Sequence, residues 1–338
     1  MPKARHDEVS PALKEVFATA IRRAEDFAQA DANRLLSEPL RRGRLDVVSE
    51  YAAPLTMHVF MDMMGLPREH WAGVDGWVRS ALAGHDIAID PRVRFDGGTS
   101  TMALRAYFQG LGLGGVEAAT AAGDVPLMCG IRALTDAPWG TATKCPFDAA
   151  EAPQAKPPLT LTEAIQTALH FALGGYLSTE FLITTGVFNL LSHPEQLKTL
   201  SPKCGSEQLE RAIQEMLRYD APFQMADRVV TEDVDAGDGV RLKKGQSVTL
   251  IYGSANHDPK LVDKPDVFDI SREPVRHFGF GPPSRYCIGQ QLALTVARVA
   301  LRTLLESFPF GNTPRMQAGD WLADPYYRSL KSLQVLAE

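Results

Sequence analysis

One of the four cysteines of the sequence, Cys287, lies near the end of a loop rich in glycine and proline that runs from His277 to Gly289. Residues 290–305 follow directly, and their apolar side chains recur at helical spacing. The N–H groups and dipole at a helix N-terminus favour a thiolate over a thiol. A thiolate on a glycine-rich loop, where backbone can approach a flat ligand, suits an axial bond to haem iron. For the cysteine alone, a role as a small buried apolar side chain is the commoner alternative.

The loop as a whole resembles the haem-binding loop of the cytochrome P450 superfamily. One departure concerns its length, because five residues separate Gly281 from Cys287 where the family usually has three. We interpret Pro282-Pro283 as the insertion. The features that match are Phe278, Gly281, the basic residue Arg285 two before the cysteine, Cys287, Gly289 two after it, and Leu292-Ala293.

A carboxylate and a guanidinium group lie three residues apart in Glu215-Met-Leu-Arg218, and hence on one face of a helix. Taken alone, this pair is more often an exposed surface ion pair. The resemblance implies instead that Glu215 pairs with Arg218 and with Arg272 upstream of the loop. These three residues would form a buried structural network that fixes the haem loop.

Three basic residues match family positions that contact the haem propionates. They are Arg228, Arg285 and His6, and arginine is suited to bidentate recognition of a carboxylate. Without the cysteine loop, both arginines would be interpreted as solvated surface residues. His6 matches the family's C helix, although the arginine that often follows four residues later is Ser10 here.

Residues 160–191 are predicted to form one long helix that begins with the capping box Thr160-Leu-Thr-Glu163. It resembles the family's I helix, and residues 174–179 align with the A/G-G-x-acid-Thr signature. Gly174 and Gly175 would allow close approach to the oxygen-binding face. Ser178, or Thr179 after a small shift, would be the catalytic alcohol that delivers protons. The acid position is Leu177, and Glu180 lies about 300° further round the helix, which makes it an uncertain replacement.

The periodicity predicts a mainly α fold with a small β region late in the chain. The helical segments expected are 8–36 ending before Pro39, 45–64, 68–82, 101–110, 125–134, 160–191, 206–219 and 290–305. The strands expected lie at 229–231, 240–242, 247–252 and 330–335, and loops at 90–101 and 136–158. The resemblance implies one cytochrome P450 domain over 1–338, with a helical region over residues 1–135, the loop 136–158, and 159–338 holding the I and K helices, small sheet, cysteine loop and L helix. The resemblance begins at the family's C helix, near His6, so the segment that precedes this helix in the family is expected to be missing.

The composition limits which classes of partner and which cellular compartment the sequence favours. A formal net charge of −6 over 338 residues argues against nucleic acid. The four cysteines have no C-x-x-C pair, which favours reduced thiols in the cytoplasm. The N-terminus lacks the apolar stretch of a signal peptide or membrane anchor. The apolar segment 164–191 carries Glu180 near its middle, and because a charge is costly in lipid, we expect a buried helix there and not a membrane span.

The resemblance implies a haem-thiolate monooxygenase that contains haem b (iron protoporphyrin IX). It would hydroxylate a small apolar molecule, with electrons from NAD(P)H supplied through a ferredoxin-type redox partner. Leu177 keeps a second interpretation open, in which the enzyme uses peroxide, reduces a nitrogen oxide or rearranges its substrate. The expected absence of the N-terminal segment keeps a third interpretation open, in which the protein binds haem but has no catalytic activity.

Overall fold

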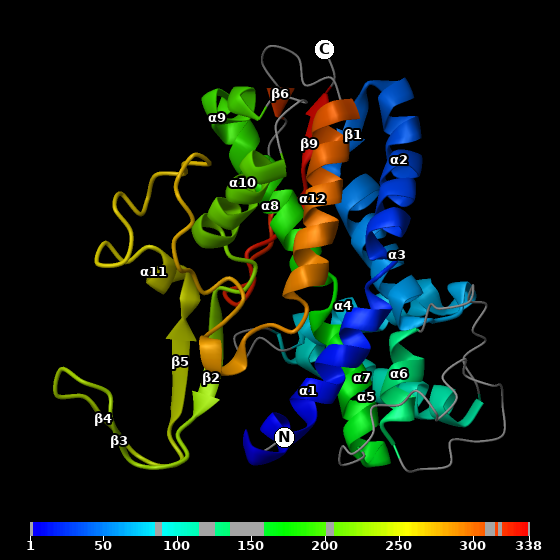
Figure 1. Cartoon of the computed structure of the whole chain (residues 1–338), viewed down its shortest axis with the longest axis vertical. Helices are drawn as coiled ribbons and strands as arrows, with labels where there is room; N and C mark the ends of the chain where they lie inside the picture. The colour runs from blue at the N-terminus through cyan, green and yellow to red at the C-terminus, as the bar shows by residue number, and fades with distance from the viewer. Residues whose placement is uncertain are drawn as a thin grey trace. The chain divides into compact units, whose positions relative to one another are not determined.

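Helices make up most of the chain in the computed structural model, which describes residues 3–84, 90–114, 126–135, 159–200, 206–307, 315–316 and 320–336 (Figure 1). The chain forms two compact units. The first comprises 1–42, 49–180 and 288–304, and the second comprises 43–48, 181–287 and 305–338. The predicted loop 136–158 lies outside the described residues. None of the described helices is both long enough and apolar enough to cross a membrane.

The first unit is helical. Its elements are α1 (Lys3–Ala20), α2 (Ala24–Arg42), α3 (Ala53–Met64), η2 (Arg68–His70), α4 (Trp71–Ala83), α5 (Pro91–Gly114), α6 (Leu127–Ala133), α7 (Leu161–Gly174), the start of α8 (Leu177–Ser192) and most of α12 (Gln290–Ser307). Figure 1 shows α12 beside α2, and Gln29 of α2 donates a hydrogen bond to the Thr303 hydroxyl at 2.9 Å. On α4, Trp71, Val74 and Val78 are buried, as their helical spacing predicts.

The second unit contains the sheets. Strand β9 (Gln334–Leu336) pairs antiparallel with β1 (Arg44–Asp46) and with β6 (Arg315–Met316). Strand β2 (Met225–Val229) pairs antiparallel with β5 (Ser247–Ile251), with Arg228 opposite Val248. The remaining elements are α9 (Pro194–Thr199), α10 (Ser206–Tyr219), β3 (Val234–Asp235), β4 (Arg241–Leu242), α11 (Tyr252–Asn256), η3 (Pro283–Arg285), β7 (Asp320–Trp321) and β8 (Leu330–Ser332).

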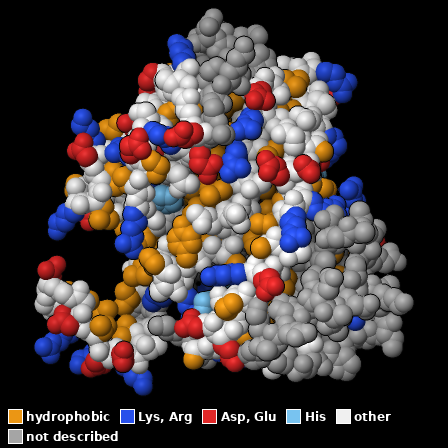
Figure 2. Space-filling model, viewed as in Figure 1, with side chains coloured by type: hydrophobic (Ala, Val, Ile, Leu, Met, Phe, Trp, Pro, Cys, Tyr) orange, Lys and Arg blue, Asp and Glu red, His pale blue; other side chains and the backbone are white. Residues whose placement is uncertain are grey.

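The β2–β5 ribbon exposes apolar side chains. Val229, Leu250 and Ile251 are 69%, 37% and 54% exposed, and Figure 2 shows orange side chains gathered over these strands at the lower left.

The segment Leu45–Met64, predicted as one helix, begins differently. It opens with strand β1, continues as a π-helix, η1 (Val47–Ala52), and becomes α-helical only from Ala53 to Met64. The buried Asp46 carboxylate accepts the amides of Val48 at 3.1 Å and Leu333 at 3.0 Å. Only the start of the predicted helix is wrong, because the strand partner of residues 44–46 lies near the other end of the chain, where a local pattern does not reveal it.

The predicted loop at 90–101 is also wrong, because residues 91–101 belong to α5. Pro91 fits the first helical position, and the Asp90 carboxylate accepts the amide of Arg92 at 2.8 Å. A Cβ added to Gly97 would lie 2.6 Å from the Cα of Gly84, at the end of α4. Gly97, one of the two glycines that indicated a loop, instead permits α4 and α5 to pack closely.

The helix predicted over 8–36 is two helices, separated by a turn at residues 21–23. Helix α2 also continues through Pro39 and ends at Arg42, and Gly43 follows it with φ +66°. Pro39 occupies the last turn of α2, where its missing N–H removes one helical hydrogen bond and only three helical residues follow.

Candidate functional site

The Cys287 loop, in the second unit, is held by its own backbone. Gly281 has φ +78°, a conformation that favours glycine, and its amide donates to the Phe278 carbonyl at 2.8 Å. The Cys287 amide donates to the Phe280 carbonyl at 3.0 Å. Between these bonds, Pro283–Arg285 forms the 3₁₀ turn η3. Of the two residues interpreted as an insertion, Pro282 is extended and Pro283 begins this short turn, and the exposed Cys287 follows it.

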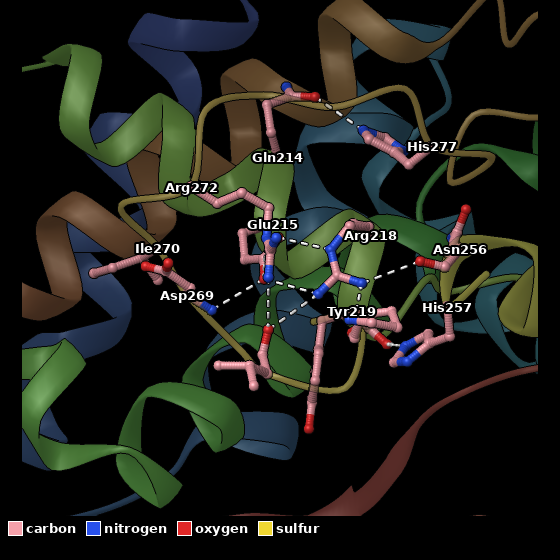
Figure 3. Close-up of polar contacts among 12 residues, drawn as sticks. Gln214, Glu215, Arg218, Tyr219, Asn256, His257, Asp269, Ile270, Arg272 and His277 are labelled. Carbon is pink, nitrogen blue, oxygen red and sulfur yellow. Dashed lines mark hydrogen bonds and ion pairs between the residues drawn. The ribbon is translucent and has the colours of Figure 1, made fainter. Parts of the chain in front are cut away.

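Glu215, Arg218 and Arg272 lie together in the second unit (Figure 3). Arg218 donates from Nε and Nη2 to the two carboxylate oxygens of Glu215, both at 2.8 Å. Arg272 Nε lies 3.3 Å from Glu215 Oε2. The Glu215 and Arg218 side chains are 2% and 1% exposed, so the surface ion pair is excluded. A charge-assisted pair this deeply buried needs further hydrogen bonds to offset its loss of hydration.

Backbone carbonyls supply those further bonds. Arg218 donates to the carbonyls of Pro265 at 2.8 Å and Asn256 at 3.1 Å, and Arg272 donates to that of Asp263 at 2.7 Å. Glu215 also accepts the amide of Asp269 at 3.0 Å. The network therefore fixes the chain segment 256–272 that leads to the cysteine loop.

Asn256 and Tyr252, the two ends of the short helix α11, contact the loop at Phe278. The Asn256 Oδ1 accepts the Phe278 amide at 2.7 Å. The Tyr252 ring lies parallel to that of Phe278, with centroids 6.1 Å apart and an interplanar angle of 11°. The sequence motifs include neither residue. The available signal was the change from the β-like run Ser247-Val-Thr-Leu-Ile251 to the polar residues Asn256-His-Asp.

His277, at the start of the loop, also has a contact that the sequence did not predict. Its Nε2 lies 3.0 Å from Gln214 Oε1, and its Nδ1 accepts the Gly279 amide at 3.1 Å. These contacts require a neutral ring with the proton on Nε2. Burial, with the nearby Arg218 charge, lowers the pKa of His277 to about 4.

Arg228 and Arg285 are both exposed. Arg228 donates to the Tyr252 hydroxyl at 3.0 Å and to the Asp227 carbonyl at 2.7 Å. Across the described part of the chain, neither arginine forms an ion pair with a carboxylate within 4.0 Å. Both guanidinium groups therefore remain able to bind an acidic ligand.

In the first unit, the predicted long helix is interrupted at Gly175-Tyr176, between α7 and α8. A Cβ added to Gly175 would lie 2.0 Å from the ring of Phe60, on α3, whereas one added to Gly174 would meet nothing within 4 Å. The Ser178 hydroxyl donates to the Gly174 carbonyl at 3.2 Å. Thr179 is 4% exposed, while Ser178 is only partly buried. The capping box at Thr160 and Glu163 is confirmed.

Glu180 is buried beside this interruption and belongs to a charged cluster. Arg79 of α4 donates to both of its carboxylate oxygens, at 2.7 and 3.3 Å, and also to Asp75. The Tyr176 hydroxyl donates to Asp75 at 2.8 Å. Burial raises the pKa of Glu180 although Arg79 opposes the shift. A rotation of about 300° from Leu177 in one sense equals about 60° in the other, so Leu177 and Glu180 are neighbours on the helix surface.

Two further predicted residues lie in the first unit. His6 is partly buried on α1, with Nδ1 3.2 Å from the Asp7 carboxylate. Gly289 accepts the Ala293 amide at 2.9 Å, which makes it the residue that opens α12.

Comparison with known proteins identifies the family to which the chain belongs. A family profile described as "Cytochrome P450" matches residues 207–324. The chain is 30% identical over 308 residues to the biotin biosynthesis cytochrome P450 of Bacillus subtilis (strain 168), covering 90% of this chain and 71% of that protein. The chain belongs to the cytochrome P450 family.

Other members of the family agree in sequence and in structure. This cytochrome P450 is 27% identical over 316 residues to the cytochrome P450 monooxygenase PikC of Streptomyces venezuelae, covering 93% of this chain and 68% of PikC. It matches P450BioI, solved in complex with an acyl carrier protein ligated to hexadec-9Z-enoic acid, with a TM-score of 0.81 and 27% identity over 96% of this chain and 78% of that one. The mainly α cytochrome P450 fold is confirmed, and the chain is a haem-thiolate monooxygenase.

Proposed function

We propose that this cytochrome P450 hydroxylates a small apolar molecule with dioxygen, and that Cys287 would supply the thiolate ligand of its haem b. The observation that carries this proposal is the Cys287 loop, whose backbone is fixed by its own hydrogen bonds and, through Asn256, by the Glu215–Arg218 pair. A rigid loop holds a ligand atom in place before the cofactor binds. The exposed Cys287 supplies the sulfur donor.

The residues of the chain fit haem chemically. Arg228 and Arg285 offer exposed guanidinium groups for the two propionate carboxylates, and His6 is a third candidate. Gly281 and Gly289, with Phe278, belong to the loop that would cover one face of the ring. Gly174 leaves open space where a side chain would otherwise stand.

When bound, haem with a thiolate ligand supplies the activation of dioxygen. The chain would supply protons through Ser178, because its hydroxyl is partly accessible and already oriented by the Gly174 carbonyl. Thr179 is the buried alternative. Electrons would come from NAD(P)H through a ferredoxin-type partner. The acyl chain bound to the carrier protein of P450BioI supports an apolar substrate class.

The test is the spectrum of the reduced protein under carbon monoxide. We expect the red-shifted Soret band that is diagnostic of thiolate ligation, and we expect Cys287→Ala to lose it. A Cys129→Ala variant, which removes a buried cysteine in the other unit, is the matched control and should keep the band. An unchanged band in Cys287→Ala would exclude Cys287 as the ligand.

A second candidate is peroxide-driven oxidation, which is favoured by the buried Leu177 at the position of the expected acid. The carboxylate nearest in sequence, Glu180, has both oxygens engaged by Arg79. Comparing turnover with hydrogen peroxide against turnover with ferredoxin and NADPH separates the two. Faster turnover with ferredoxin supports the dioxygen route, and faster turnover with peroxide supports the alternative.

A further inference from the structure

We propose that Tyr252 is a positioning residue that couples the guanidinium group of Arg228 to the Cys287 loop. The inference rests on the proposed role of Arg228 at a haem propionate. Tyr252 is 8% exposed and begins α11, directly after strand β5. It therefore lies between the strand pair that carries Arg228 and the loop that carries Cys287.

The first contact is with Arg228. Its Nη2 donates to the Tyr252 hydroxyl at 3.0 Å, while its Nη1 donates to the Asp227 carbonyl at 2.7 Å. The two bonds hold the planar guanidinium group at two of its corners, which fixes its orientation as well as its position. An arginine that is exposed yet held in this way loses less side-chain freedom when it binds a carboxylate.

The second contact is with Phe278 of the loop. The rings of Tyr252 and Phe278 are close to parallel, at 11°, with a centroid separation of 6.1 Å that implies an offset arrangement. One tyrosine therefore uses its hydroxyl for Arg228 and its ring face for the loop.

Asn256, four residues later on α11, adds a second attachment at Phe278. Residues four apart lie on the same side of a helix, and the Asn256 Oδ1 accepts the Phe278 amide at 2.7 Å. The Asn256 carbonyl accepts a hydrogen bond from Arg218. Helix α11 thus connects the Glu215–Arg218 pair, the loop and Arg228, and Tyr252 is the member that reaches Arg228.

A purely structural tyrosine would also be buried and stacked on a neighbouring ring. The hydroxyl separates the two roles, because Tyr252→Phe keeps the ring and removes only the acceptor for Arg228. The matched control is Tyr219→Phe, which also removes a tyrosine hydroxyl. Tyr219 lies on α10, and its ring packs on His257 and Phe268 and not on the loop.

The experiment measures the rate of haem transfer from the purified holoenzyme to apomyoglobin, together with the midpoint potential of the haem. We expect Tyr252→Phe and Arg228→Gln each to lose haem about fivefold faster, the effect of roughly one hydrogen bond. The double variant should be no faster than Arg228→Gln alone, because the tyrosine acts through the arginine. Both single variants should shift the potential in the same direction, and Tyr219→Phe should match the wild type.

Tyr252→Leu provides an independent readout on the loop. Removing the ring should speed hydrogen exchange in the peptide 277–287, which Tyr252→Phe should leave unchanged. Tyr252→Phe behaving as wild type in haem loss, or effects that add in the double variant, would overturn the inference. Failure of the proposed function has a different signature, since the wild-type protein itself would then lack a thiolate-ligated haem.

Discussion

Both carboxylate oxygens of Glu180 accept hydrogen bonds from Arg79, which joins the first turn of α8 to α4. Arg79 also holds Asp75, and Asp75 accepts the hydroxyl of Tyr176 at the interruption between α7 and α8. The Glu180 side chain is 3% exposed and that of Arg79 is 38% exposed. The Glu180 carboxylate therefore relies on Arg79 to compensate its buried charge, whereas the guanidinium group of Arg79 is also partly hydrated by solvent.

Removing Arg79 is expected to destabilise the fold strongly. Arg79→Met leaves Glu180 buried without its cation, and we expect it to lower the free energy of unfolding by about 2–4 kcal/mol, less than for a fully enclosed pair. Urea denaturation measures this loss. Arg5→Met is the control, because the carboxylates that Arg5 pairs with, Glu8 and Glu163, are 46% and 21% exposed and stay hydrated without it, so it should cost clearly less than Arg79→Met. Equal losses of unfolding free energy in the two variants would show that the buried Glu180–Arg79 pair stabilises the fold no more than an exposed ion pair does.

The two glycines at the end of α7 are expected to differ in how much stability their substitution by alanine costs. Gly175→Ala places a Cβ 2.0 Å from the Phe60 ring and 2.4 Å from the Phe171 carbonyl, so we expect a loss of about 1–3 kcal/mol in unfolding free energy. Gly174→Ala meets nothing within 4 Å and should change stability by about 1 kcal/mol or less. Thermal unfolding of both variants distinguishes them, and a Gly175→Ala protein as stable as Gly174→Ala would contradict the close packing of α7 against α3.

A second glycine pair tests the packing of α4 against α5. Gly97→Ala would bring its Cβ to 2.6 Å from Gly84 Cα and 2.9 Å from the Ser80 carbonyl oxygen, and should cost about 1–3 kcal/mol. Its neighbour Gly98 has open space, so Gly98→Ala should be neutral or stabilising by up to about 1 kcal/mol. Urea midpoints that fall in the reverse order would refute the close approach.

These glycines also show where reasoning from the sequence succeeds. A strong apolar stripe or a capping signal predicts a helix well, as at α4, α10, α12 and the start of α7. Gly97 and Gly98 instead resemble loop signals, because a sequence does not reveal whether glycine serves a turn or a close helix contact. Strand β1 escapes prediction for a related reason, since its partner β9 comes from the opposite end of the chain.

The candidate site divides in the same way. Glu215, Arg218 and Arg272 can be found because their order along the chain matches a family pattern, and the structure adds the carbonyls that complete their hydrogen bonds. Tyr252 and Asn256 escape prediction because their importance comes from contacts with Phe278, which belongs to a separate loop later in the chain. Contacts of this kind depend on the fold, and no spacing within the sequence encodes them.

His277 is expected to make the stability of the protein depend on pH. Its folded pKa is about 4, below the ordinary value of 6.5, so between these values the unfolded state binds more protons. The contribution of His277 is therefore fully present above pH 6.5 and is lost as pH falls towards 4, by up to about 3 kcal/mol. His277→Gln cannot titrate, so the difference in unfolding free energy between wild type and variant should shrink over this range. A difference that stays constant from pH 7 to about 4 would mean that the ring is not held neutral by Gly279 and Gln214.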